Sequence, residues 1–341
     1  MTTGKKHFEF TIHCLFSLRY ILQVELPIEI VYNGEDDLPA SNRAILRQFP
    51  EIQFVNLEEE LAMNTSLIQG WSIKPFAMLA SSFEEIMFID SDVLFTKNPT
   101  FLFEDEKFKE TGTMFFKDRA IWKKRGGATR AAQRLIPYPM ESVEQLRIWN
   151  DPGTDHEMES GVLLLNKNSP AFQALLLNCR LNMIQERQFM YERFHGDKEV
   201  FWISHEILRI PYSFVGGYAG NIGYMQEGWH CGSVAHTYNE ELLWWNNGVL
   251  ANKESSMDTF MEMNEYSMDV AEPGSRVLWK LDSNPFCLQA PQGTEYLKVK
   301  QIDAHTLKLI AIYRGLWKKI RGFKESESSI YQYVKSLRDM N

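Results

Sequence analysis

The feature that most constrains this chain is an apolar run that carries two carboxylates, IMFIDSDVLF at residues 86–95. Its first residues favour a strand, and successive side chains on a strand point to opposite faces of the sheet. A carboxylate buried in such a strand without a partner costs several kcal/mol. We therefore expect the strand to end at Asp90, and a cationic group to meet Asp90 and Asp92.

Strand patterns alternate with helical patterns along the chain, which indicates an α/β protein. The sequence predicts strands over 28–32, 52–57, 86–90, 111–119, 160–167, 276–282 and 295–302. It predicts helices through 10–21, 72–83, 169–187, 197–208 and 304–320. Residues 1–252 are expected to form the main domain, 253–272 a polar linker or insertion, and 273–341 an extension that packs on the main domain.

Composition excludes several classes of partner and site. The 341 residues carry a formal net charge of −9, which argues against nucleic acid because phosphate binding requires a basic surface. No 18-residue apolar run and no signal-peptide core occur, so no membrane segment is expected in this chain. The four cysteines have no CxxC spacing, which disfavours zinc and permits one or two disulfides.

Ligands of open α/β sheets bind at the carboxyl ends of the strands. Asp90 and Asp92 would lie there, and two carboxylates suit Mg²⁺ or Mn²⁺ with phosphate oxygens completing the shell. Phosphatases of the haloacid-dehalogenase type have a DxDx(T/V) motif near the chain start, whereas here Leu94 occupies the Thr/Val position. Nucleotide-sugar glycosyltransferases are the other class with this arrangement, and a high content of Trp and Tyr suits sugar binding.

Four blocks in order carry a resemblance to a known family. They are GWSIKPFAMLASSFEEIMFIDSDVLFTKNPTFLFEDEKFKETGTMFFKDR (70–119), ESGVLLLNK (159–167), GDKEVFW (196–202) and LLWWNNGVLANK (242–253). From about residue 4 to 253 the chain resembles the fungal α-mannosyltransferases of the Golgi, glycosyltransferase family 71. The resemblance implies a GT-A-type fold, with a mixed, mostly parallel central sheet flanked by helices. It also implies GDP-mannose as donor, Mn²⁺ or Mg²⁺ as the ion, and retaining transfer to a mannose hydroxyl on a glycoprotein glycan or mannan.

The resemblance also assigns roles to residues. It implies a metal site of Asp90, Asp92 and His236, with catalytic roles for Glu159 and Asp197; helix capping would also account for Asp197. A zinc site from His230, Cys231 and His236 is a weaker alternative. The residues implied to contact the donor are Lys74, Asp90, Asp118, Arg119 and Gly161. Trp244 and Trp245 would stack on sugar, with core filling as the alternative.

Location and completeness follow from the same resemblance. Members of the family carry a strand before the turn at which this chain starts, so we expect the first strand and a type II membrane anchor upstream. The domain would then act in the Golgi lumen. Two alternatives stay open: a transferase using another nucleotide sugar, and a non-catalytic glycan-binding or scaffold subunit of a mannan-synthesising complex.

Overall fold

The computed structural model describes residues 1–61, 63–119, 121, 127–150, 154–271 and 275–322. Most strands among them join one mixed sheet with the core order β11-β12-β8-β7-β5-β6-β3. In that sheet β10 also pairs with β7 and β13, and β9 pairs with β8 and β4. The strands are β3 (Glu85–Ile89), β4 (Leu94–Phe95), β5 (Thr113–Lys117), β6 (Met158–Asn166), β7 (Phe214–Gln226), β8 (Trp229–Tyr238), β9 (Glu241–Trp245), β10 (Glu265–Asp269), β11 (Leu278–Lys280), β12 (Cys287–Gln289) and β13 (Leu297–Gln301).

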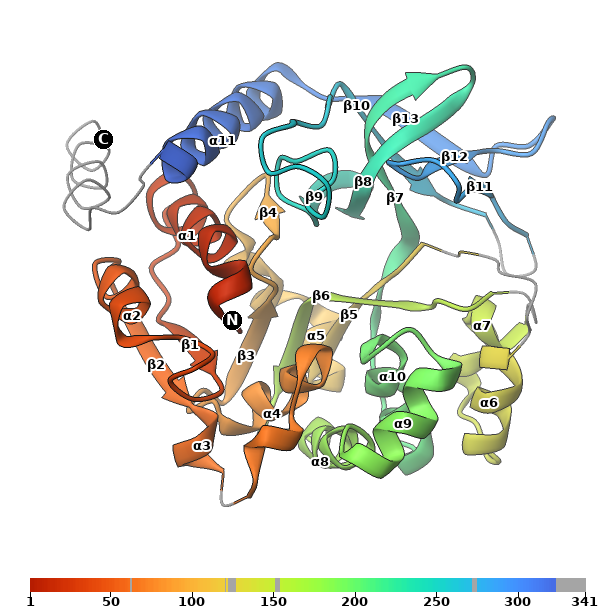
Figure 1. The fold of residues 1–341 in the computed structure, drawn as a ribbon. Coiled ribbons are helices and arrows are strands. Elements are labelled where there is room, and N and C mark those ends of the chain that lie inside the picture. Colours follow the sequence, from red (N-terminus) through yellow and green to blue (C-terminus); the bar gives the residue numbers. More distant parts are fainter. Residues whose placement is uncertain (62, 120, 122–126, 151–153, 272–274, 323–341) are drawn as a thin grey trace.

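Helices cover this sheet and confirm the predicted α/β class. The helices are α1 (Phe8–Phe16), α2 (Ala40–Leu46), α3 (Leu57–Glu60), α4 (Ile73–Ala80), α5 (Glu106–Thr111), α6 (Gly127–Leu135), α7 (Arg147–Asn150), α8 (Ala171–Leu181), α9 (Ile184–Arg193), α10 (Lys198–Leu208) and α11 (Ala304–Gly322). Figure 1 shows α4, α8, α9 and α10 gathered at one end of the molecule, with α1 and α11 packed together at the other. The helix predicted over 169–187 is two helices, α8 and α9.

The expectation of a mostly parallel sheet is wrong. Among the described residues, β5–β7 is the one parallel pair in the large sheet, and its other pairs are antiparallel. Two tight hairpins are one cause, since a two-residue loop can join only antiparallel strands. Glu227–Gly228 joins β7 to β8 and Asn239–Glu240 joins β8 to β9, and all four residues have positive φ, as type I′ turns require.

Strand β7 was not predicted because its sequence, FVGGYAGNIGYMQ, is rich in glycine and lacks a regular apolar alternation. The glycines permit close backbone approach between strands. A Cβ atom at Gly223 would overlap the carbonyl oxygen of Cys231 on β8. The glycines that make β7 hard to recognise in the sequence are thus also the residues that let it pair closely with β8.

The described residues of the segment at 253–272 are not a linker throughout, while an insertion there and the division into domains stay predictions. These residues contain β10, whose Ser267, Met268 and Asp269 are buried between β7 and β13. The segment 275–322 packs on the preceding part of the chain. Its Tyr313 hydroxyl donates to the Phe95 carbonyl and accepts from Ser17 Oγ, which ties α11 to the rest of the molecule.

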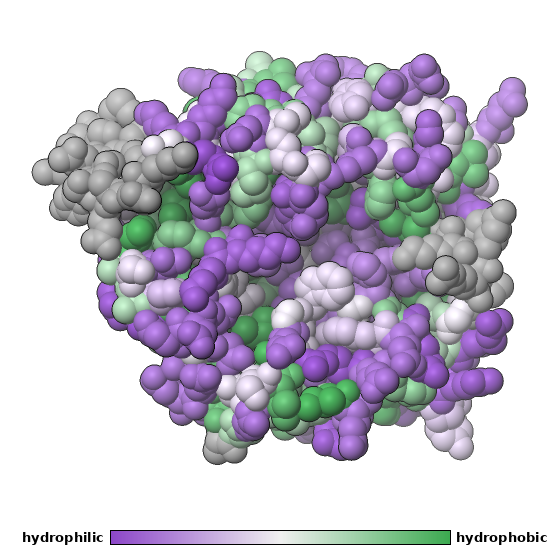
Figure 2. Space-filling model, in the orientation of Figure 1, coloured by the Kyte–Doolittle hydropathy of each residue, from purple (hydrophilic) through white to green (hydrophobic). Residues whose placement is uncertain are grey.

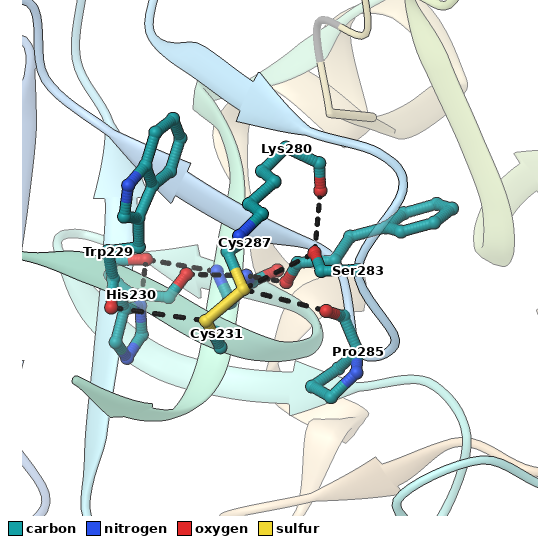
Figure 3. The surroundings of a disulfide bond; sticks show 10 residues. Trp229, His230, Cys231, Lys280, Ser283, Pro285 and Cys287 are labelled. Atoms are coloured by element: carbon teal, nitrogen blue, oxygen red, sulfur yellow. Dashed lines mark hydrogen bonds between the residues drawn. A yellow bond between two sulfur atoms is a disulfide. The ribbon is translucent and has the colours of Figure 1, made fainter. Parts of the chain in front are cut away.

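A disulfide joins Cys231 on β8 to Cys287 on β12, and Figure 3 shows it beside Ser283 and Pro285. Cys14 and Cys179 are free and buried. Because Cys231 is bonded to sulfur, the zinc alternative from His230, Cys231 and His236 is wrong.

Strand β1 (Ile28–Tyr32) pairs in parallel with β2 (Ile52–Asn56) in a separate two-stranded sheet. The backbone of the first residues runs along β1: Thr2 forms a parallel bridge to Val31, and the Met1 ammonium donates to the Glu29 carbonyl. A cavity of about 890 Å³ with mainly apolar walls lies between β1 and β3. The expectation of a first strand upstream stays a prediction.

A buried ion pair joins α7 to β10. The Arg147 guanidinium donates to both carboxylate oxygens of Asp269 and to the Ala271 carbonyl, and its centre lies 3.8 Å from the centroid of the Tyr218 ring. Both charged side chains are at most 1% exposed. Asp269 is therefore the carboxylate that directly pairs with the arginine, and Glu157 is a weaker acidic neighbour.

We predict that Asp269→Asn lowers the free energy of unfolding by about 3–5 kcal/mol, because it leaves a buried guanidinium without its anion. Urea denaturation followed by far-UV circular dichroism measures the change. The control is Glu192→Gln, which removes a largely exposed pair with Arg193 and should cost less than about 1 kcal/mol. Equal unfolding midpoints for wild type and Asp269→Asn would show that the pair does not hold β10 in place.

Candidate active site

One polar cleft of about 840 Å³ lies where several strands end. It is lined by the first residues of the chain, by the turn after β1, and by segments at 68–74, 90–92, 159–160, 195–198 and 253–254. Figure 2 shows a hollow near the middle of this face, bordered largely by hydrophilic residues. Most of the residues predicted from the sequence to form a site line this cleft or lie directly behind it.

Strand directions explain how acids distant in sequence meet at this edge. Strand β6 runs antiparallel to both β3 and β5, so its first residues lie beside the carboxyl ends of those strands. Asp90 N–H donates to the Gly161 carbonyl, and Asp118 N–H donates to the Glu157 carbonyl. Asp90, Asp118 and Glu159 are thereby held at one edge of the sheet.

Lys74, in the first turn of α4, anchors the first group of charges. Its ammonium donates to Asp90 Oδ2 at 2.8 Å and to the Ser160 carbonyl at 3.0 Å, and it lies 3.8 Å from Asp197 Oδ2. Burial alone would lower the pKa of Lys74, but Asp197 and Asp90 together raise it. Burial and repulsion from Asp92 raise the pKa of Asp90 to about 6 despite this lysine. Burial also raises the pKa of Asp197, against the pull of Lys74.

Lys198, in the first turn of α10, anchors the second group. Its ammonium donates to Asp118 Oδ2 at 2.7 Å and to Glu159 Oε2 at 2.8 Å. Burial tends to raise the pKa of each carboxyl, and Lys198 is the largest opposing influence. Together with weaker ones, from His156 and Arg119 at Asp118 and from His236 at Glu159, it lowers the pKa of Glu159 and holds that of Asp118 well below its usual range. Glu159 also accepts the Gly161 N–H, at 3.0 Å. Two buried carboxylates are therefore held ionised around one lysine.

Asp92 meets a third lysine, Lys253, whose ammonium forms an ion pair with Asp92 Oδ2. The main chain of Asp92 is fixed as well, since its carbonyl accepts the Gly248 N–H. The loop after β9 thus reaches back to the Asp-Ser-Asp turn. The cationic groups expected to meet the carboxylate pair are Lys74 at Asp90 and Lys253 at Asp92.

The three residues predicted to hold a metal are not brought together. Asp90 and Asp92 line the cleft, but His236 is buried and its ring stacks on Trp244 at 3.9 Å. Burial lowers the pKa of His236 to about 4, with Glu159 and Asp118 as the nearest acidic influences. No three His, Cys, Asp or Glu side chains of the described part gather as a metal site. Metal holding would therefore fall to the Asp90–Asp92 pair together with ligand oxygens.

Three further expectations of direct sugar or donor contact do not hold. Trp244 and Trp245 have no exposed surface, because β9 is covered on both faces, so neither can stack on a sugar. The space beside Gly161 is occupied by Trp244, whose ring would lie 3.1 Å from a Cβ atom there. The core-filling alternative for these tryptophans is the correct one.

Asp118 and Arg119 lie behind the cleft wall. The Arg119 guanidinium lies over the rings of Trp279 and Phe286, at 5.8 and 5.2 Å from their centroids, and so faces the β11–β12 hairpin. Asp118 connects to the cleft through Lys198. The Asp197 side chain does not cap α10 with a hydrogen bond, which leaves the carboxylate to Lys74 and the cleft.

Sequence reasoning missed two of the three lysines and an exposed aromatic residue. Lys198 and Lys253 lie inside the blocks at 196–202 and 242–253 that carry the family resemblance, but from the sequence a lysine there could equally be a solvated side chain. Trp71, 54% exposed, lines the cleft in the turn just before α4. Only the folded chain reveals which of these side chains face the acids.

We predict that Lys198→Met lowers the free energy of unfolding by about 3 kcal/mol near neutral pH, since two buried carboxylates lose their cation. Lys198 lowers the pKa values of Asp118 and Glu159 in the folded state. Its contribution to the free energy of unfolding is therefore fully present above the unfolded carboxyl pKa of about 4, and it is lost as the pH falls through the lower folded-state pKa values. In the variant both pKa values rise, so protonation relieves the repulsion at mildly acidic pH. The difference from wild type should therefore shrink between about pH 7.5 and pH 5.

Urea titrations at both pH values measure this difference, and Lys109→Met serves as the control. Lys109 pairs with Glu104 on the surface, with both side chains more than half exposed, so its replacement should have little effect at either pH. A loss in Lys198→Met that does not change with pH would mean that lost packing, and not the carboxylates, accounts for it.

Comparisons with known proteins identify relatives of this chain. Residues 1–240 match the family model described as "Mannosyltransferase putative". A relative from Candida albicans, "Putative alpha-1,3-mannosyltransferase MNN14", is 28% identical over 61% of this chain and 33% of its own length. The Saccharomyces cerevisiae protein "Alpha-1,3-mannosyltransferase MNT2" is 28% identical over 73% of this chain and 51% of its own length. The chain thus spans about a third to a half of the length of these relatives.

Two solved glycosyltransferases have some structural likeness to this chain. The galactosyltransferase LgtC aligns over 63% of this chain and 72% of its own, with 14% identity and a TM-score of 0.41. Mouse xyloside xylosyltransferase 1 aligns over 63% of this chain and 83% of its own, with 16% identity and a TM-score of 0.39. Because the family model covers 240 of the 341 residues, the chain belongs to the mannosyltransferase family that this model describes, in line with its resemblance to fungal α-mannosyltransferases.

Proposed function

We propose that this chain transfers an α-mannosyl unit from GDP-mannose to a mannose hydroxyl on a glycoprotein glycan or mannan, with retention of configuration. The observation that carries the proposal is the cleft itself, in a chain of this family. Its lining includes four carboxylates and the three lysines that pair with them, at the edge of the sheet where α/β proteins bind ligands: Asp90, Asp92, Glu159, Asp197, Lys74, Lys198 and Lys253.

Mn²⁺ or Mg²⁺ is the proposed cofactor, held by Asp90 and Asp92. Such ions accept one or two carboxylates and complete their shells with water and phosphate oxygens, so this pair fits without His236. Lys253 pairs with Asp92 and would have to turn toward the diphosphate, which a long flexible side chain that is about a third exposed permits. When bound, the ion would offset the charge that develops on the departing diphosphate.

The chain's own residues would then act on the sugar. Lys198 keeps Glu159 ionised, and a fixed carboxylate in a cleft stabilises positive charge that develops on a reacting sugar carbon. Lys74 orients Asp90 and Asp197 toward the same space. Glu159 and Asp197 are therefore the proposed catalytic residues, and Asp118 acts behind them by positioning Lys198.

The proposed site of action is the Golgi lumen, as for the family it resembles. In the part of the chain that the structure describes, no helix is both long and apolar enough to cross a membrane. A second candidate function is a non-catalytic glycan-binding or scaffold subunit. The Lys253–Asp92 ion pair favours this reading, since it already neutralises one of the proposed metal ligands.

We expect GDP-mannose to bind the wild-type chain in the presence of Mn²⁺, and the affinity to fall at least about tenfold with EDTA or in Asp92→Asn, because the ion links carboxylate to diphosphate. Isothermal titration calorimetry measures the binding, and release of GDP with an α-linked mannobiose acceptor measures the transfer. Asp258→Asn is the control, since Asp258 is a largely exposed carboxylate outside the cleft.

Each result separates the candidates. Binding unaffected by EDTA and by Asp92→Asn would overturn the metal site. Binding and turnover with UDP-glucose or UDP-galactose in place of GDP-mannose would replace the donor. A folded protein that binds mannobiose but no nucleotide sugar would overturn the transferase proposal and support the non-catalytic glycan-binding subunit.

A further inference from the structure

Trp71 is the one tryptophan, tyrosine or phenylalanine among the described residues that line the cleft. Its side chain is 54% exposed, whereas Trp244 and Trp245 are fully buried. Leaving a tryptophan exposed on the wall of a polar cleft gives up the gain from burying its large apolar surface. An exposed tryptophan in a cleft is therefore typical of a binding site in which the ligand covers the ring.

The backbone under Trp71 is held firmly. Trp71 lies in the single turn Gly70–Ser72 that leads into α4, and this turn has a capping box between Gln69 and Ser72. Ser72 Oγ, which is buried, donates to the Gln69 carbonyl at 2.8 Å and accepts from Arg187 of α9 at 2.7 Å. The ring is therefore placed before any ligand arrives, which reduces the entropy lost on binding.

One side of the indole is backed by the segment before α10. A Cβ atom at Gly196, where φ is +71°, would lie 2.6 Å from Trp71 Cε3, so glycine is what allows the contact. The His195 ring lies against Trp71 with 5.3 Å between centroids. The indole is thus a supported flat surface whose remaining area is open to solvent.

The polar groups beside this surface match a sugar. Lys74 lies one helical turn after Trp71, and Asp197 and Lys198 follow directly after Gly196. A pyranose offers an apolar C–H face to stack on an aromatic ring and hydroxyls that reach carboxylates and ammonium groups. Since Trp71 is half exposed, it suits the part of a ligand that extends out of the cleft, as an oligosaccharide acceptor does.

We propose that Trp71, backed by His195 and Gly196, is the stacking platform for the acceptor sugar. This role was expected of Trp244 and Trp245 from the sequence. The inference rests on the proposed transfer to a mannosylated glycan and adds the subsite that would hold that glycan. It assigns Trp71 to the acceptor, and the donor to the Asp90–Asp92 side of the cleft.

The test compares Trp71→Ala with Trp71→Phe and with Tyr138→Ala. Phenylalanine keeps a flat ring, and Tyr138 is a 77% exposed aromatic residue outside the cleft lining. In transfer assays with GDP-mannose and α-linked mannotriose, Trp71→Ala should raise the acceptor KM at least about tenfold. Its donor KM should stay within about twofold, Trp71→Phe should lie in between, and Tyr138→Ala should match wild type.

A binding arm keeps this test separate from the proposed activity. Titration of mannotriose without nucleotide, followed by calorimetry, should give an affinity that falls about tenfold in Trp71→Ala even if no turnover is seen. The platform is overturned if Trp71→Ala and wild type have the same acceptor KM. If there is no turnover, it is overturned by equal mannotriose affinities of the two proteins. A change confined to the donor KM, with weaker GDP binding, would instead assign the indole to the nucleotide. If the wild-type protein transfers no mannose, but binds mannotriose more tightly than Trp71→Ala does, the proposed transfer is refuted and the stacking platform is supported.

Discussion

Lys74 and Lys198 compensate four carboxylates at one edge of the sheet, and the rest of the site depends on this compensation. Asp90 and Asp197 lie about Lys74, while Asp118 and Glu159 lie about Lys198. Removing so many charges from water is costly unless opposite charges lie within a few ångströms. Both lysines come from the first turns of helices, α4 and α10, that must dock on the sheet in register. The charges therefore tie the position of two helices to the positions of three strand ends.

The second half of the chain closes the site from the other side. Strands β7 to β10 extend the sheet beyond β5, with the Cys231–Cys287 disulfide fixing the β12 hairpin to it. The loop after β9 brings Gly248 and Lys253 to Asp92. The Asp-Ser-Asp turn is thus held by the strand before it, by β6 beside it and by a loop that follows it by about 155 residues in the chain. A ligand in this cleft would meet residues from Thr2 to Glu254.

Some of this arrangement could be read from local patterns. The strands at 28–32 and 52–56 and the strand that stops just before Asp90 agree with the structure, because short apolar runs bounded by polar turns leave few alternatives. The β7–β8 hairpin did not follow from the sequence. Its glycines suppress the alternation that identifies a strand, and its turn begins with Glu227 at positive φ where Asn-Gly is the usual signal. Strand β10 was hidden in the same way, by charged neighbours in a stretch that resembles a linker.

By itself the sequence determined the α/β class, the acidic turn at the end of β3, and a family likeness that the comparisons confirm. Those features are local, since they can be inferred from the periodicity of hydrophobic residues and from the order of residues along the chain. Only the tertiary structure decided which side chains face the cleft. Trp71 and Trp244 have the same chemistry, but one is more than half exposed in the cleft and the other is fully buried against His236 and Phe116. His236 was expected at Asp92, but Lys253 lies there, because burial and proximity depend on how distant segments pack and residue type does not record that.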